Sequence, residues 1–102
     1  MKFLNYKKIV GDKMELVDLI YKICREEKTL GKLDIEKKTK FADLWLNTDF
    51  QKELDLKKNA TEKDKTSYIR LNKEYIKICN DIVEQKALVN YLNNVLNVKL
   101  KS

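Results

Sequence analysis

The apolar positions between Thr61 and Leu100 follow a helical heptad. This stretch contains no proline or glycine, and Thr61 and Asp64 have the spacing of a capping box at a helix N-terminus. Eight of its ten a and d positions are apolar; the ten are Tyr68, Leu71, Tyr75, Ile78, Ile82, Gln85, Val89, Leu92, Leu96 and Lys99. The pattern predicts one long helix of coiled-coil character over residues 61–100.

This predicted helix is longer than the rest of the chain can cover. A forty-residue helix measures about 60 Å, whereas a compact domain of this size has a radius of gyration of about 13 Å. Its uncovered apolar positions need a second copy, another partner, or a break at Glu84-Gln85-Lys86 or Asn93-Asn94. We favour a homodimer, parallel or antiparallel, whose self-association residues are Tyr75, Ile78, Ile82, Gln85, Val89, Leu92 and Leu96. Gln85 then either sets the register or is a partly exposed glutamine.

Two shorter helices are predicted upstream. Asp12 is spaced to cap a helix over residues 12–30, and Gly31 is placed to end it in a left-handed conformation. The buried stripe of this helix is expected to hold Leu16, Val17, Ile20, Ile23 and Cys24. Asp34 can cap a second helix over residues 34–46.

The segment Asn47-Thr48-Asp49 predicts the end of that helix and the cap of a short one over residues 49–55. Residues 1–11 are expected to precede the helices as an arm. Their pattern is compatible with a short strand, an ordered segment without regular structure, or a first helical turn. No repeat or second domain is evident. The expected fold is all-α, a single domain over residues 1–102 in which two to three short helices pack on one long C-terminal helix.

Composition limits where the protein works. The 102 residues are 43% apolar and 37% charged, and no apolar run approaches the roughly twenty residues of a membrane span. The N-terminus lacks the apolar region and cleavage site of a signal peptide. These features predict a cytoplasmic protein without a membrane partner.

The formal net charge of +6 makes nucleic acid a candidate partner. Seven lysines form a candidate nucleic-acid patch if they share a face: Lys37, Lys38, Lys40, Lys57, Lys58, Lys63 and Lys65. The alternative is ordinary solvated surface, and only two of the 22 basic residues are arginine, the preferred reader of bases and phosphates. Trp45 and Phe50 either stack on bases or anchor the core.

The residue inventory predicts a non-enzyme. The chain has no histidine, so Ser67, Ser102, Cys24 and Cys79 have no imidazole base. Its two glycines cannot form a phosphate-binding loop. Without histidine or a Cys-x-x-Cys pair, no metal site and no cofactor are expected. The two cysteines are predicted to be buried free thiols.

The segment Leu44-Trp45-Leu46-Asn47-Thr48-Asp49-Phe50, then Glu53-Leu54 and a charged link into Tyr68-Ile69, carries a family resemblance. Over residues 44–100 the chain resembles small helical proteins encoded by phages and prophages of low-GC bacteria. Their arginine-tyrosine pair early in the long helix is replaced here by Ser67-Tyr68. The resemblance implies a mobile-element origin and binding to host machinery, including anti-CRISPR-like inhibition.

Two functions therefore stay open. The first is a non-enzymatic helical interaction protein that binds, and inhibits, a host nucleic-acid-handling or defence complex. Exposed acids, Glu26 and Glu27 or Asp49 and Glu53, would mimic phosphates there. The second is a nucleic-acid-binding accessory protein that neutralises phosphates with its lysines.

Overall fold

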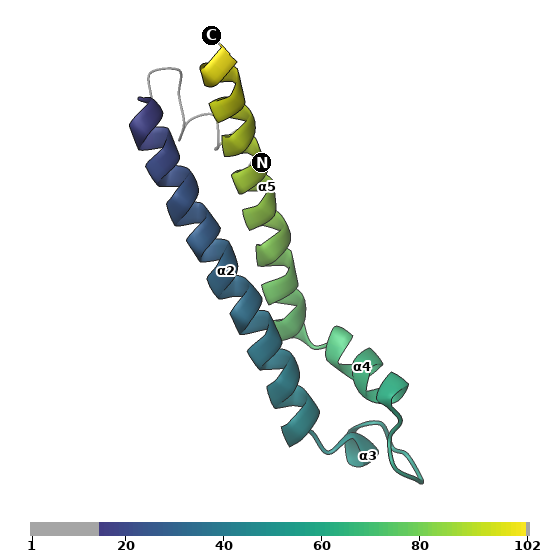
Figure 1. Ribbon diagram of the computed structural model, residues 1–102. Coiled ribbons are helices and arrows are strands. Elements are labelled where there is room, and N and C mark those ends of the chain that lie inside the picture. Colours follow the sequence, from purple (N-terminus) through teal and green to yellow (C-terminus); the bar gives the residue numbers. More distant parts are fainter. Residues whose placement is uncertain (1–14, 102) are drawn as a thin grey trace. The chain divides into compact units, whose positions relative to one another are not determined.

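The computed structural model describes residues 15–101, which form helices and loops (Figure 1). The helices are α2 (Leu16–Asn47), α3 (Phe50–Glu53), α4 (Glu62–Arg70) and α5 (Lys73–Lys101). No strand occurs within residues 15–101, so the predicted all-α class is confirmed. The predicted arm over residues 1–11 and the Asp12 cap lie outside the described residues.

The chain divides into two compact units, and both long helices contribute to each. Unit 1 contains residues 15–32, the first half of α2, and residues 82–101 of α5. Unit 2 contains residues 33–81: the second half of α2, then α3, α4 and the first turns of α5. The expectation of a single domain over residues 1–102 stays a prediction.

α2 is one helix where two were predicted. The predicted stop at Gly31 and the predicted cap at Asp34 were wrong, since both residues lie inside the helix. A row with alternating spacings of four and three is buried or half-buried on both sides of Gly31: Leu19, Ile23, Glu26, Leu30, Leu33, Lys37, Lys40 and Leu44. Packing along this row outweighs the roughly 1 kcal/mol by which glycine disfavours a helix.

The predicted buried stripe of the first helix was also largely wrong. Leu19 and Ile23 are buried in unit 1, whereas Leu16, Val17, Ile20 and Cys24 are exposed. The local stripe contains more apolar residues, but only the row through Leu19 and Ile23 continues along the whole helix. Because a helix end was predicted at Gly31, the continuous row that faces α5 was not recognised in the sequence.

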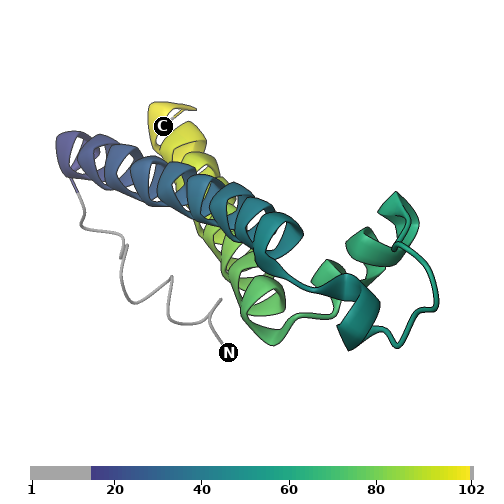
Figure 2. The ribbon, with the colours of Figure 1, turned by 90° about the horizontal axis from the view of Figure 1, so that it is seen from below.

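The predicted helix over residues 61–100 is broken at Leu71 and Asn72, not at either expected weak point. Asn72 caps α5 by accepting a hydrogen bond from the Tyr75 N–H at 3.0 Å. On the other side of the break, Ile69 of α4 is 0% exposed, and the Tyr68 ring meets Phe50 edge-on at 5.4 Å. The chain turns at this junction within unit 2 (Figure 2), because α4 packs toward α3 instead of continuing into α5.

Two predicted caps are confirmed. Asp49 caps α3 by accepting from the Lys52 N–H at 3.2 Å. At the start of α4, Thr61 Oγ1 accepts from the Asp64 N–H at 3.1 Å, and Asp64 Oδ2 accepts from the Thr61 N–H at 3.0 Å. This is the reciprocal capping box expected from the sequence. The Asp64 carboxylate also lies in the first turn of α4, where the helix dipole favours a negative charge.

Candidate functional site

The seven predicted self-association residues belong to the core of the chain. Ile78, Ile82, Val89 and Leu92 are buried, and Tyr75, Gln85 and Leu96 are half-buried. In unit 1 the cover is the chain's own α2, since Leu92 clusters with Leu19 and Ile23. Figure 1 shows the α2 and α5 segments of unit 1 side by side. The premise of an uncovered helix was wrong, and with it the need for a second copy along this row.

Gln85 has a specific partner within unit 1. Its amide nitrogen Nε2 donates to the Glu26 carbonyl oxygen at 2.9 Å and to Glu26 Oε2 at 2.7 Å. Glu26 Oε1 also lies 3.7 Å from Lys22 Nζ. The polar residue in the heptad is thus satisfied by a polar residue in the facing row, which fixes the pairing of the two helices.

Unit 2 contains all seven lysines of the candidate nucleic-acid patch, but two of them are engaged elsewhere. Lys40 donates a hydrogen bond to Glu74. Lys65 Nζ lies 5.0 Å from the centroid of the Trp45 ring and 5.6 Å from that of Phe50. Lys37 is half-buried in the α2 row that includes Leu33 and Lys40. These three lysines do not join an open basic surface.

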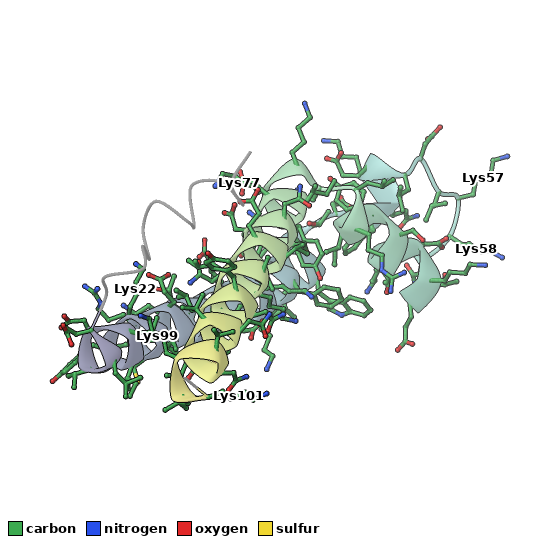
Figure 3. All side chains as sticks on the ribbon, turned by 90° about the horizontal axis from the view of Figure 1, so that it is seen from above. Lys22, Lys57, Lys58, Lys77, Lys99 and Lys101 are labelled. Carbon is green, nitrogen blue, oxygen red and sulfur yellow. The ribbon has the colours of Figure 1, made fainter. Side chains whose placement is uncertain are left out.

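The other four lysines of the candidate patch are exposed. Lys57 and Lys58 extend outward from the link between α3 and α4 (Figure 3). Lys58 and Lys63 lie near Asp64: hydrogen bonds from Thr61 are the main cause that lowers the pKa of Asp64, and the two lysines add to it. Lys38 is on an exposed side of α2. Of the predicted patch, only Lys58 and Lys63 are shown to lie near a common acid, Asp64.

The aromatic residues of unit 2 anchor its core. Phe50 is buried, and half-buried Trp45 stacks on Phe41 with ring centroids 5.8 Å apart. Phe41 also meets Tyr75 of α5 at 6.1 Å. Between the two sequence-based alternatives for Trp45 and Phe50, these contacts favour core packing over base stacking.

Unit 2 contains a cleft between α2 and α5. It has a volume of about 510 Å³, and its lining residues are Glu36, Thr39, Lys40 and Asp43 of α2 with Glu74, Lys77, Ile78 and Asp81 of α5. We call this the polar cleft. On each helix two acids lie seven residues apart, on one face of that helix. Four carboxylates against two ammonium groups give the lining a net charge of −2.

Ion pairs organise the polar cleft. Lys40 of α2 binds Glu74 of α5 across it, and Lys77 Nζ lies 3.2 Å from Asp81 Oδ2. The hydrogen bond to Glu74 raises the pKa of Lys40, with the charges of Glu74 and Asp43 adding to the rise and partial desolvation opposing it. Asp43 accepts from the Asn47 amide at 2.7 Å. Glu36 makes no ion pair or hydrogen bond with the described part of the chain, so its charge is available.

The sequence pattern did not predict this cleft. Its only sequence signal is the spacing of Glu36 with Asp43 and of Glu74 with Asp81, which is also common on solvated helix faces. The acids proposed instead are partly used by the fold, because Glu26 binds Gln85 and Asp49 caps α3. Within residues 15–101, no three His, Cys, Asp or Glu side chains gather closely enough to hold a metal ion together.

A second surface feature lies on α2 in unit 1. Leu16, Val17, Ile20, Tyr21 and Cys24 are exposed neighbours at helical spacing, away from the buried row of Leu19 and Ile23. We call these five residues the outer strip. Val17 and Tyr21 are 64% and 69% exposed. The prediction of two buried thiols was wrong, since Cys24 is exposed in this strip and Cys79 is half-buried.

None of the helices within residues 15–101 combines the length and the apolarity that crossing a bilayer requires. The chain matches no protein-family model, no curated protein and no solved structure.

Proposed function

We propose that the protein is a non-enzymatic interaction protein that binds a basic segment of a protein partner in the polar cleft. The observation that carries the proposal is the pairing of two acid rows across a cleft of about 510 Å³. Lysine and arginine side chains from a partner would enter between Glu36 and Asp43 on one side and Glu74 and Asp81 on the other. Such side chains are abundant on proteins that handle nucleic acids. The carboxylates of the polar cleft would bind them in place of the nucleic-acid phosphates.

The internal ion pairs support recognition of a basic segment. Lys40 and Lys77 each neutralise one acid, Glu74 and Asp81, and hold the two helices' acids in place. Glu36 and Asp43 then supply the negative charge that is left. Preorganised charges lower the entropy lost on binding. The available charge on Glu36 makes it the first contact for an incoming cation.

The wider functional setting is part of the same proposal. The resemblance noted for residues 44–100 implies a phage or prophage protein that acts in the cytoplasm of a bacterial host on a nucleic-acid-handling or defence complex. The absence of histidine from the sequence supports a binding role over acid–base catalysis. The homodimer expected along α5 gains no support, because its residues are covered within the chain.

Charge balance favours a protein partner over nucleic acid. Residues 33–81 contain eleven basic and ten acidic residues, so unit 2 has a net charge of +1. Most of the formal charge of +6 lies outside the unit that holds the candidate lysine patch. A site that neutralises several phosphates needs a concentrated excess of cations, which the lysines of unit 2 do not provide.

Affinity capture with matched variants tests the proposal. The tagged protein, Glu36→Lys and the control Glu27→Lys would be compared in the same lysate of a low-GC bacterium. Glu27 is an exposed acid of α2 outside the cleft. The proposal predicts a protein that is lost with Glu36→Lys, is retained with Glu27→Lys, and binds the purified chain less tightly as salt rises. Identical capture by all three chains would contradict it.

A parallel titration distinguishes the alternative function. Fluorescence anisotropy with a labelled DNA duplex and a labelled single strand would be measured at 50 and 200 mM salt. The proposal predicts no saturable binding at either salt concentration. Binding that falls steeply with salt and is weakened by Lys57→Ala and Lys58→Ala together would instead assign the nucleic-acid function to the exposed lysines.

A further inference from the structure

The outer strip of α2 carries charges that match a second copy of itself. Its apolar residues Leu16, Val17, Ile20, Tyr21 and Cys24 lie in the first three turns of α2, within unit 1. Asp18 and Arg25 border one side of the strip, and both are exposed. They are seven residues apart, so they lie on the same flank of the helix, separated by about 10.5 Å along its axis.

We propose that the protein self-associates by antiparallel pairing of two outer strips around a two-fold axis. In an antiparallel pair of identical helices related by a two-fold axis, each flank faces the same flank of the partner copy. With the axis midway between residues 18 and 25, Asp18 of each copy meets Arg25 of the other. One acid and one base on a single flank thus produce two symmetric ion pairs.

The apolar side chains interdigitate in the same register. The axis falls between Tyr21 and Lys22, so the two Tyr21 side chains come close to the centre. At 1.5 Å per residue, Cys24 of one copy reaches a height between Val17 and Ile20 of the other. The small cysteine therefore fits between two larger side chains. A parallel pairing would turn the Asp18–Arg25 flank of each copy toward the opposite flank of the other, so neither ion pair would form.

The size of the strip predicts a weak dimer. Two such strips bury on the order of 1,000 Å² in total, at the low end of specific interfaces. A dissociation constant on the order of 100 µM is expected, because association entropy offsets much of the apolar gain. The interface uses the outer strip of unit 1, whereas the proposed partner site is the polar cleft of unit 2. Either proposal can fail without the other.

Charge exchange tests the pairing. Sedimentation velocity would be run from 10 to 1,000 µM on the full chain, Asp18→Arg, Arg25→Asp, the double exchange and the control Glu62→Arg. Each single exchange places like charges together and is expected to weaken the dimer at least tenfold. The double exchange restores both ion pairs and is expected to return the dissociation constant to within about threefold. Glu62→Arg changes the charge by the same amount on an exposed residue of α4 in unit 2, outside the outer strip, and should change little.

Circular dichroism of each variant would confirm unchanged helicity, because Asp18 lies in the first turn of α2. The double exchange also replaces Asp18 but restores the ion pairs. It therefore distinguishes an effect of the Asp18 substitution on α2 from an effect of losing the ion pairs. A mass of one chain at every concentration would overturn the proposal. So would a dimer that the single exchanges leave intact, since it would form through another surface.

Discussion

At the scale of single residues, Gln85 and Glu26 show how a polar pair is used inside this chain. The heptad pattern places Gln85 among apolar residues and is compatible with either register setting or partial exposure. Its two hydrogen bonds to Glu26 favour the first role, with a partner from the same chain. That partner was unpredictable from sequence, because Glu26 lies in a row that continues beyond Gly31.

Replacing Gln85 with alanine should destabilise the fold. Glu26 would lose its amide donor at a half-buried position, and the expected loss is about 1–2 kcal/mol of unfolding free energy. Urea denaturation followed by circular dichroism measures it. Gln51→Ala is the control, since Gln51 is exposed on α3. Equal stability of the two variants would show that the Gln85–Glu26 pair contributes nothing.

The capping box of α4 predicts an acid-sensitive contribution to stability. Hydrogen bonds from Thr61 lower the pKa of Asp64 below its ordinary value of 3.8. A lowered folded pKa means that the contribution is complete above pH 3.8 and is lost as pH falls through the lower folded value. Asp64→Asn should therefore reduce the melting temperature at pH 7 more than at pH 2.5. A difference that does not depend on pH would contradict the assignment.

At the scale of elements, the sequence predicted caps better than helix lengths. The caps at Asp49 and Thr61 depend on side chains within three residues, and both were correct. The end of a helix at Gly31 and its continuation through Asn72 depend on distant packing, and both were mispredicted. Local signals determine a cap, whereas the row that faces another helix decides whether a glycine interrupts or an asparagine begins a helix.

Gly31→Ala should stabilise the protein. Gly31 is exposed in the interior of α2, and a Cβ added there would meet no atom within 4 Å. Alanine is expected to raise the unfolding free energy by about 0.5–1 kcal/mol. Ala42→Gly, at an exposed position of the same helix, is the reciprocal control and should lower it by a similar amount. Destabilisation by Gly31→Ala would indicate that α2 is interrupted at this residue.

At the scale of the whole molecule, the main finding is the origin of the cover over α5. The sequence identified the apolar row correctly, since Ile78, Ile82, Val89 and Leu92 are all buried. We expected a second copy to cover that row, because the predicted helix end at Gly31 divided the complementary row of α2 into two parts. The polar cleft was not predicted for the same reason. Its two acid rows form one site only because α2 and α5 are neighbours in unit 2, and the sequence pattern did not predict that pairing.

The cover of α5 by its own chain is tested most directly by methyl NOEs in unit 1. Leu92 packs with Leu19 and Ile23, so NOEs between its methyl groups and theirs are expected in a ¹³C-labelled sample. In an equal mixture of labelled and unlabelled chains, an isotope-filtered experiment should show none of these NOEs between chains. Leu92 NOEs to Leu19 or Ile23 that appear only between chains, or not at all, would contradict the account.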